Sequence, residues 1–150
     1  MRQQAKRLVI KILRDYPNLS EEIRKRENEL MNPIREVDNN VGGGRAQNHP
    51  WTYHDNIVIT IDEDKLIRTL KREQHVIDDC LDKAGDETVK IIKNVYMKKH
   101  PDTIKGLIAQ NKLWCGTTKA YKLRDQFIEE VAKRLGLAFY WGGKRNGRYE

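Results

Sequence analysis

Hydroxyl and cationic side chains gather in a short stretch in the last third of the chain. They are Thr117, Thr118, Lys119, Tyr121, Lys122 and Arg124. Lysine and arginine can neutralise phosphates or donate to guanine N7 and O6, while threonine can donate to phosphate or contact a thymine methyl group. The tyrosine can donate through its hydroxyl group. This set of donors favours contact with double-stranded DNA, and we expect Lys119 and Lys122 to be the principal contacts.

The apolar residues around these donors predict a helix that presents them. Steps of three and four residues place one set on a shared buried face: Ala120, Leu123, Phe127, Val131 and Leu135. Thr117, Thr118, Lys119, Lys122 and Gln126 then lie outside that face. The stretch 103–137 fits two helices joined by a tight connection, which is typical of a helix-turn-helix whose second helix reads base edges. The alternative is an ordinary amphipathic surface helix with solvated lysines.

Arg124 has an alternative role of its own. It can pair with Asp125, or with a carboxylate on the preceding helix, and would then support the structure instead of contacting DNA.

The distribution of charge favours an anionic partner for the last part of the chain. The sequence has a pI near 9.4. Residues 86–150 carry a formal net charge of +7, residues 32–85 of −3 and residues 1–31 of +3. Nucleic acid and an anionic membrane both fit this charge, but no run approaches the ~20 apolar residues of a spanning helix. Nothing at the start resembles a signal peptide, so we expect a cytoplasmic protein without a membrane partner.

The remaining patterns predict an all-α protein with a helical N-terminal extension. Residues 1–61 read as an N-terminal helical segment and a long glycine-containing loop, and residues 62–150 as a helical DNA-binding domain with a basic tail. The first helix should pack through one stripe of Leu8, Val9, Ile12, Leu13 and Tyr16 and should break or kink at Tyr16, before Pro17. A second helix follows to about residue 31, and residues 57–61 could form an isolated extended strand. Asp62 is the expected N-cap of a helix that stops at Gly85, and a further helix covers residues 87–99.

Two basic elements lie outside the predicted helix pair. Gly42, Gly43 and Gly44 precede Arg45, and their unblocked N–H groups could bind a phosphate that the arginine clamps; the alternative is a flexible hinge. In the tail, Lys144 and Arg145 belong to a basic arm that can add salt-sensitive affinity.

No pattern in the chain indicates an enzyme, a cofactor or a metal site. His49, His54 and Asp55 match no metal-binding spacing. Cys80 and Cys115 are isolated, so neither a disulfide framework nor a zinc site is indicated, and both suit small buried positions.

Three features together resemble the phage late-gene transcriptional activators of the RinA/ArpU type. They are the N-V-G-G-G-R element at residues 40–45, a long helix ending near Gly85, and the closing pattern with Tyr121, Arg124-Asp125 and IEEVAKRLG. The similarity covers residues 19–137. It implies a helix-turn-helix like that of sigma factors, sequence-specific binding to phage promoter DNA, and activation of late genes for packaging or lysis. The turn NKLWCG is a residue longer than usual, and Gly116 stands where a Ser or Thr often caps the second helix.

Three functions are therefore compared. The leading hypothesis is a DNA-binding transcriptional activator, a monomer or homodimer that can also contact host RNA polymerase. The alternative is a DNA-recognition subunit of the phage packaging machinery, like a small terminase component, which should form a ring or higher oligomer. A third is a protein-interaction module that binds polymerase without DNA, which predicts no salt-dependent affinity for DNA.

Overall fold

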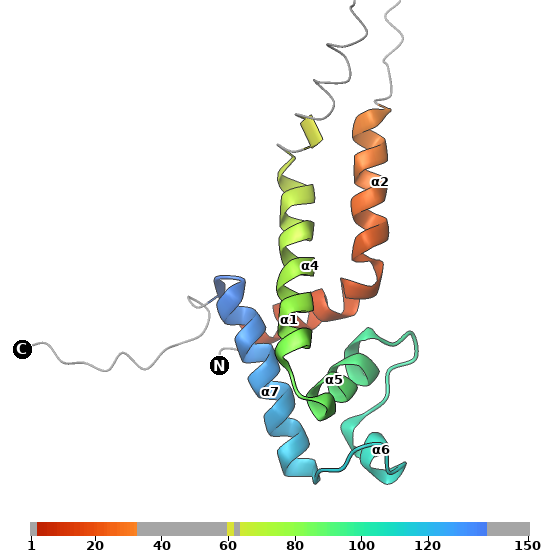
Figure 1. Ribbon diagram of the computed structural model, residues 1–150, viewed down its shortest axis with the longest axis vertical. Helices are drawn as coiled ribbons and strands as arrows, with labels where there is room; N and C mark the ends of the chain where they lie inside the picture. Colours follow the sequence, from red (N-terminus) through yellow and green to blue (C-terminus); the bar gives the residue numbers. More distant parts are fainter. Residues whose placement is uncertain (1–2, 33–59, 62–63, 138–150) are drawn as a thin grey trace, which may run out of the picture. The chain divides into compact units, whose positions relative to one another are not determined.

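The computed structural model describes residues 3–32, 60–61 and 64–137, and all regular secondary structure in these ranges is helical. This confirms the expected all-α class for the described ranges. The elements, in chain order (Figure 1), are α1 (Gln3–Asp15), the 3-10 turn η1 (Tyr16–Asn18), α2 (Leu19–Met31), α4 (Lys65–Lys83), α5 (Asp86–Ile92), the π-helical turn η2 (Lys93–Met97), α6 (Ile104–Ala109) and α7 (Thr117–Arg134).

Several residues of interest lie outside the described ranges. They include the triglycine element 42–44, Arg45, the two loop histidines, and Lys144 and Arg145 of the tail. Predictions on these residues remain predictions.

The chain divides into two compact units, and each is described separately. One contains Met1–Pro17 and Glu73–Glu150, and the other contains Asn18–Arg72. Sequence reasoning placed α1 with the N-terminal segment, whereas α1 packs with the last helix of the chain. The cause is its apolar face, which is buried against α7.

The core of the first unit joins α1, the second part of α4, the end of α5, η2 and α7. Its buried side chains are Val9, Ile12, Leu13, Ile77, Cys80, Ile92, Tyr96, Phe127, Ile128, Val131 and Ala132. Leu8 was expected in this core, but 42% of it is exposed, while Ala5 is buried. The buried stripe of α1 therefore runs from Ala5 through Val9 to Leu13, four residues at a step, and Leu8 lies beside it.

The segment after α4 differs from a single regular helix. Gly85 is the N-cap of α5, with φ −69° and ψ 157°, and α4 has already ended at Lys83. The π-helical turn η2 follows α5 directly, so the predicted helix of residues 87–99 is an α-helix only to Ile92. Ile91, Ile92 and Tyr96 are buried, while Val89 and Val95 are half-buried. A π turn carries one residue more than an α-helical turn, which interrupts the helical periodicity after Ile92.

The break between α1 and α2 occurs where the proline predicts it. Tyr16 and Pro17 form the 3-10 turn η1. The Tyr16 hydroxyl donates a hydrogen bond to Asp78 Oδ1 of α4. Burial raises the pKa of Tyr16 to about 12, and the hydrogen bond and negative charge of Asp78 act in the same direction.

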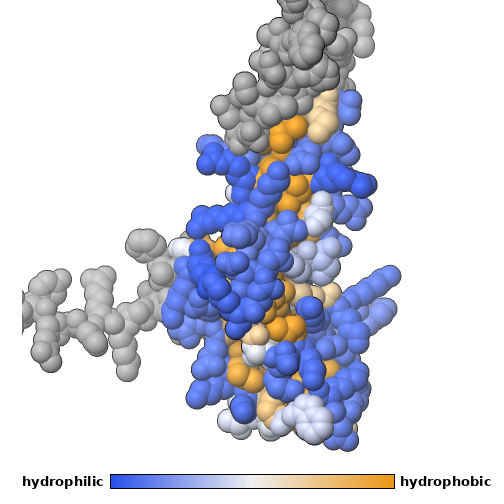
Figure 2. Space-filling view, in the orientation of Figure 1, coloured by the Kyte–Doolittle hydropathy of each residue, from blue (hydrophilic) through white to orange (hydrophobic). Residues whose placement is uncertain are grey.

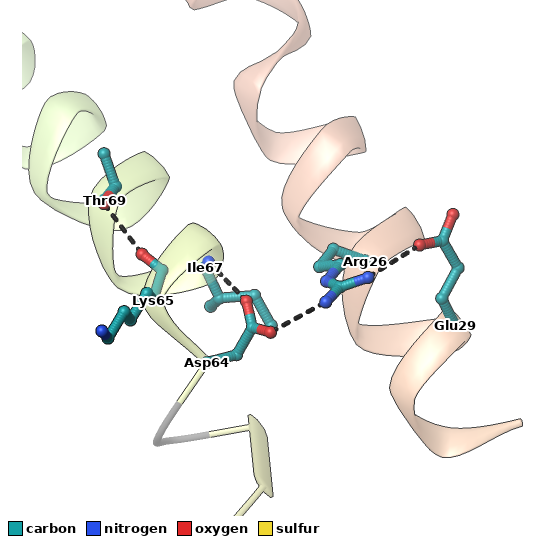
Figure 3. A network of polar contacts seen from close by, with 6 residues as sticks. All are labelled: Arg26, Glu29, Asp64, Lys65, Ile67 and Thr69. Carbon is teal, nitrogen blue, oxygen red and sulfur yellow. Dashed lines mark hydrogen bonds and ion pairs between the residues drawn. The ribbon is translucent and has the colours of Figure 1, made fainter. Parts of the chain in front are cut away.

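In the second unit, α2 and the first part of α4 lie side by side and run in opposite directions (Figure 1). Leu19, Ile23 and Ile67 are buried there. Polar contacts join the two helices: an Arg26 guanidinium nitrogen lies 3.0 Å from Asp64 Oδ2 (Figure 3), and Lys71 Nζ lies 2.9 Å from Glu27 Oε1.

Asp64, and not Asp62, caps α4. Its Oδ1 accepts the backbone N–H of Ile67 at 2.9 Å, a capping bond at the third helical residue. That bond and the Arg26 guanidinium hold the pKa of the Asp64 carboxyl below its usual value. The predicted strand is also wrong where it is described, because Thr60 and Ile61 are helical. The Ile61 carbonyl accepts from Asp64 N at 3.3 Å, so the chain turns into α4 there instead of extending.

On the face drawn in Figure 2, charged and polar side chains cover most of the described residues, and hydrophobic residues show between them. This agrees with the low hydrophobic fraction of 38%, which is enough for thin helical layers and not for a thick core.

The two leucines of α1 offer a direct test of its orientation. We expect Leu13→Ala to lower the free energy of unfolding by about 3 kcal/mol, because Leu13 is fully buried. Leu8→Ala, the matched control in the same helix, should change it by less than about 0.5 kcal/mol. Urea denaturation followed by far-UV circular dichroism measures both. Equal losses would contradict the observed face of α1.

Tyr16→Phe tests the contact at the helix corner. Because the folded-state pKa of Tyr16 is raised to about 12, its contribution to stability is complete below the unfolded value of about 10 and is lost as the pH rises towards 12. We expect the variant to lose about 1 kcal/mol at neutral pH. Its stability should then fall less steeply than that of the parent between about pH 10 and pH 12. Parallel denaturation curves across this range decide the question, and an identical alkaline decline in both proteins contradicts the assignment.

Candidate nucleic-acid interface

Helix α6 has well-defined ends. Thr103 is its N-cap, and Oγ1 of this residue accepts the backbone N–H of Gly106 at 3.0 Å. At the other end Asn111 has a left-handed backbone, with φ 53°. The N–H of Asn111 donates to Ile108 O at 3.0 Å, and that of Lys112 donates to Leu107 O at 2.9 Å. This pair of bonds is a Schellman motif, which ends the helix and turns the chain towards α7.

Helix α7 begins with an open end. Its N-cap is Gly116, with φ −71° and ψ 165°, and no side chain caps it. Sequence reasoning anticipated a glycine at this place. Because the first backbone N–H groups of a helix have no intrahelical acceptor, they are free to bind an anion such as a phosphate oxygen.

A second apolar cluster holds α6 against the start of α7. Its buried members are Ile91, Ile104, Leu107, Leu113 and Ala120. Ala120 of α7 is fully buried, and its small methyl side chain permits the residues of α6 to pack close to α7. Figure 1 shows α6 near this end of α7. The connection between the helices is residues 110–116, and Leu113 is its inward-facing anchor.

The residues predicted to face outward from α7 do so. Thr117, Thr118, Lys119, Lys122 and Gln126 are exposed, while Ala120, Phe127 and Val131 are buried and Leu123 and Leu135 are half-buried. Within the described ranges, neither lysine has an ion-pair partner. We call Thr117, Thr118, Lys119 and Lys122 the α7 edge.

Two of the predicted contacts lie deeper than the α7 edge. Tyr121 is half-buried and packs against the second apolar cluster. The Arg124 guanidinium carbon lies 4.8 Å from the centroid of the Tyr121 ring, a cation–π contact.

Arg124 makes the structural contact that was its alternative role. Its Nε and Nη2 atoms donate to Asp125 Oδ1 at 3.0 and 2.8 Å, and only 18% of its side chain is exposed. Lys6 Nζ of α1 lies 2.9 Å from the same oxygen. Partial burial raises the pKa of the Asp125 carboxyl, but the hydrogen bonds from Lys6 and Arg124 outweigh it, so the pKa is below its usual value. These three residues therefore tie α7 to α1.

Sequence reasoning missed Trp114. Its side chain is 89% exposed, although Leu113 before it is buried and Cys115 after it is half-buried. Leu113, Trp114 and Cys115 are all apolar, so their types give no signal that the tryptophan in the middle is the exposed one.

Within residues 3–32, 60–61 and 64–137, no group of three or more His, Cys, Asp or Glu side chains is placed to hold a metal ion. No helix of these ranges has the length and apolar character required to cross a membrane.

A comparison of the sequence with family models places the chain in one family. The model described as "Protein of unknown function (DUF722)" matches residues 4–133, and the chain therefore belongs to this family. Neither the curated proteins nor the solved structures contain a match.

Asp125→Asn tests the link between α7 and α1. A lowered folded-state pKa means that the charge of Asp125 contributes stability above the unfolded value of about 3.9 and that this contribution is lost in acid. The variant should be less stable than the parent at neutral pH by up to about 1 kcal/mol, since the side chain is partly solvated.

Denaturant midpoints of both proteins at neutral pH and near pH 3 give the comparison. The difference between them should shrink in acid, and a difference that does not depend on pH contradicts the charge-based explanation. Asp102→Asn removes a surface pair with Lys98, 3.1 Å away and four residues earlier. As the control it should change stability less.

Proposed function

We propose that this member of the DUF722 family binds double-stranded DNA in a sequence-specific manner through the α7 edge. The observation that carries the proposal is that Lys119 and Lys122 are exposed, without an ion-pair partner in the described ranges, beside the uncapped start of α7. A phosphate could accept hydrogen bonds from the backbone N–H groups and the two threonine hydroxyls there, while the lysines reach further along the groove.

The spacing of the two lysines supports this role. Residues three apart lie on the same side of a helix, so Lys119 and Lys122 extend in the same direction. The opposite side of α7 is fixed in both apolar clusters, which prevents the edge from rotating away. Such fixation suits sequence recognition, because base contacts require a defined register.

In this proposal Arg124 stabilises α7 and is not a principal DNA contact. Its bonds to Asp125 and its contact with Tyr121 occupy it within the protein, so we assign DNA contact first to Lys119 and Lys122. Tyr121 remains a secondary candidate through its hydroxyl group. Arg45, Lys144 and Arg145 lie outside the described residues and stay as predicted additional contacts.

The biological role we propose is transcriptional activation of phage late genes. It rests on the resemblance to activators of the RinA/ArpU type. In this proposal α6 and α7 act as a helix-turn-helix like that of sigma factors, with α6 supporting the reading helix α7. The protein would act as a monomer or homodimer in the bacterial host cell, next to RNA polymerase at a promoter.

The double variant Lys119→Ala/Lys122→Ala tests DNA binding. We expect it to lose sequence-specific retention in a gel-shift assay, with the target first obtained by selection from random duplexes. If both lysines contact phosphates, the slope of log K against log salt should also fall by about 2. Circular dichroism should not change, because both side chains are exposed.

A matched control separates these contacts from a general effect of charge. Arg24→Ala/Lys25→Ala removes the same charge from exposed positions of α2, and it should bind the selected duplex nearly as the parent does. Equal retention by the α7 variant and the parent would refute the proposal, as would a selection that yields no preferred sequence.

A further inference from the structure

Trp114 is the most exposed large hydrophobic side chain in the described ranges. Its exposed fraction is 89%, whereas Leu8, Met31 and Leu66 are exposed by 41–51%. Exposing a whole indole ring to water is unfavourable, because burying such a ring contributes several times more than burying a methyl group. The stability of the fold therefore does not account for the exposed position of this ring.

The backbone at Trp114 is held in place. Its N–H donates to Glu87 Oε2 of α5 at 3.0 Å, and Glu87 Oε1 lies 3.6 Å from Lys90 Nζ. Leu113 and Cys115 on either side pack against the second apolar cluster. The ring therefore projects from a fixed point of the connection, two residues before the N-cap of α7.

The surroundings of the ring indicate the chemistry of its partner. Nearby along the chain are the exposed Lys112 and the α7 edge, which offer cations and hydroxyl groups. The other large exposed hydrophobics of the described ranges are on α1, α2 and α4. A protein-binding hot spot normally has an apolar surround that excludes water. The exposed neighbours of Trp114 along the chain are instead Lys112 and the α7 edge, and the Glu87 carboxylate beside its backbone is already engaged by the Trp114 N–H and by Lys90.

A nucleic acid backbone fits these surroundings better than a protein surface does. It offers an apolar sugar face beside a phosphate, and an indole has a flat apolar face together with one N–H donor. The exposed lysines before and after Trp114 in the chain, Lys112, Lys119 and Lys122, match the charge of the phosphates.

We propose that Trp114 is a DNA-contacting residue, whose ring packs on a deoxyribose next to the groove that the α7 edge enters and whose Nε1–H donates to a phosphate. This inference rests on the proposed function and adds a contact to the same site. Since sugar and phosphate are the same at every base pair, the contact fixes the register of α7 and contributes affinity without sequence preference.

The test uses the full chain with Trp51→Phe and Trp141→Phe, which leaves Trp114 as its one tryptophan. A mixed-sequence DNA duplex is titrated while Trp114 emission is recorded, and inorganic polyphosphate serves as an anion without sugars. We expect the duplex to change the emission strongly and polyphosphate to leave it nearly unchanged. Trp114→Ala should weaken duplex binding roughly fivefold to tenfold, as expected for loss of one aromatic contact.

Two further variants sharpen the result. Trp114→Phe keeps an aromatic face but lacks the N–H group, so its affinity should lie between those of the parent and Trp114→Ala. Leu66→Ala removes an exposed side chain of α4 and should not alter binding. The base preference of Trp114→Ala should equal that of the parent.

The outcomes separate this inference from the proposed function. If the parent binds the duplex but its emission and the affinity of Trp114→Ala do not change, Trp114 is no DNA contact and the proposed function stands. An equal emission change with polyphosphate also overturns the inference, because the ring then senses charge alone. If the parent binds no duplex at any salt concentration, the proposed function and the inference fall together.

Discussion

Burial of the apolar face of α1 against α7 is the interaction on which the rest of the structure depends. Val9 and Leu13 of α1 and Ile128 and Val131 of α7 are all fully buried in one cluster. Each such side chain contributes roughly 1.5–3 kcal/mol on burial. The second apolar cluster, around Leu107 and Ala120, has fewer buried members. The first helix therefore fixes the position of the last one.

This arrangement divides α7 into two parts with different tasks. The part after Asp125 supplies most of the buried side chains, and the part before it carries the α7 edge. The bonds among Lys6, Arg124 and Asp125 lie where the two parts meet. Two cations are thus used within the protein there, while the lysines nearer the start of α7 remain available to a ligand.

Sequence periodicity predicted the helices well and their details less well. It identified the buried face of α7, the break at Pro17 and a glycine at the start of α7, because each follows from local backbone and spacing rules. It placed Leu8 in the core, because periodicity defines a broad apolar face on α1. Which residues of that face are buried is decided by the helix that packs against it. It also missed the π-helical turn and the exposure of Trp114, because neither a π turn nor the hydrogen bond from the Trp114 backbone to Glu87 follows from the spacing of residues.

The two cysteines of the chain are not equivalent, and this has a practical consequence. Cys80 is buried, and its burial raises the pKa of the thiol, so it exists as the unreactive protonated form in an inaccessible place. Cys115 is half-buried in the connection that precedes α7. A thiol-directed spin label or fluorophore should thus attach first at Cys115. The natural chain accordingly carries its own attachment point for spectroscopic probes, next to the surface of interest, without mutagenesis.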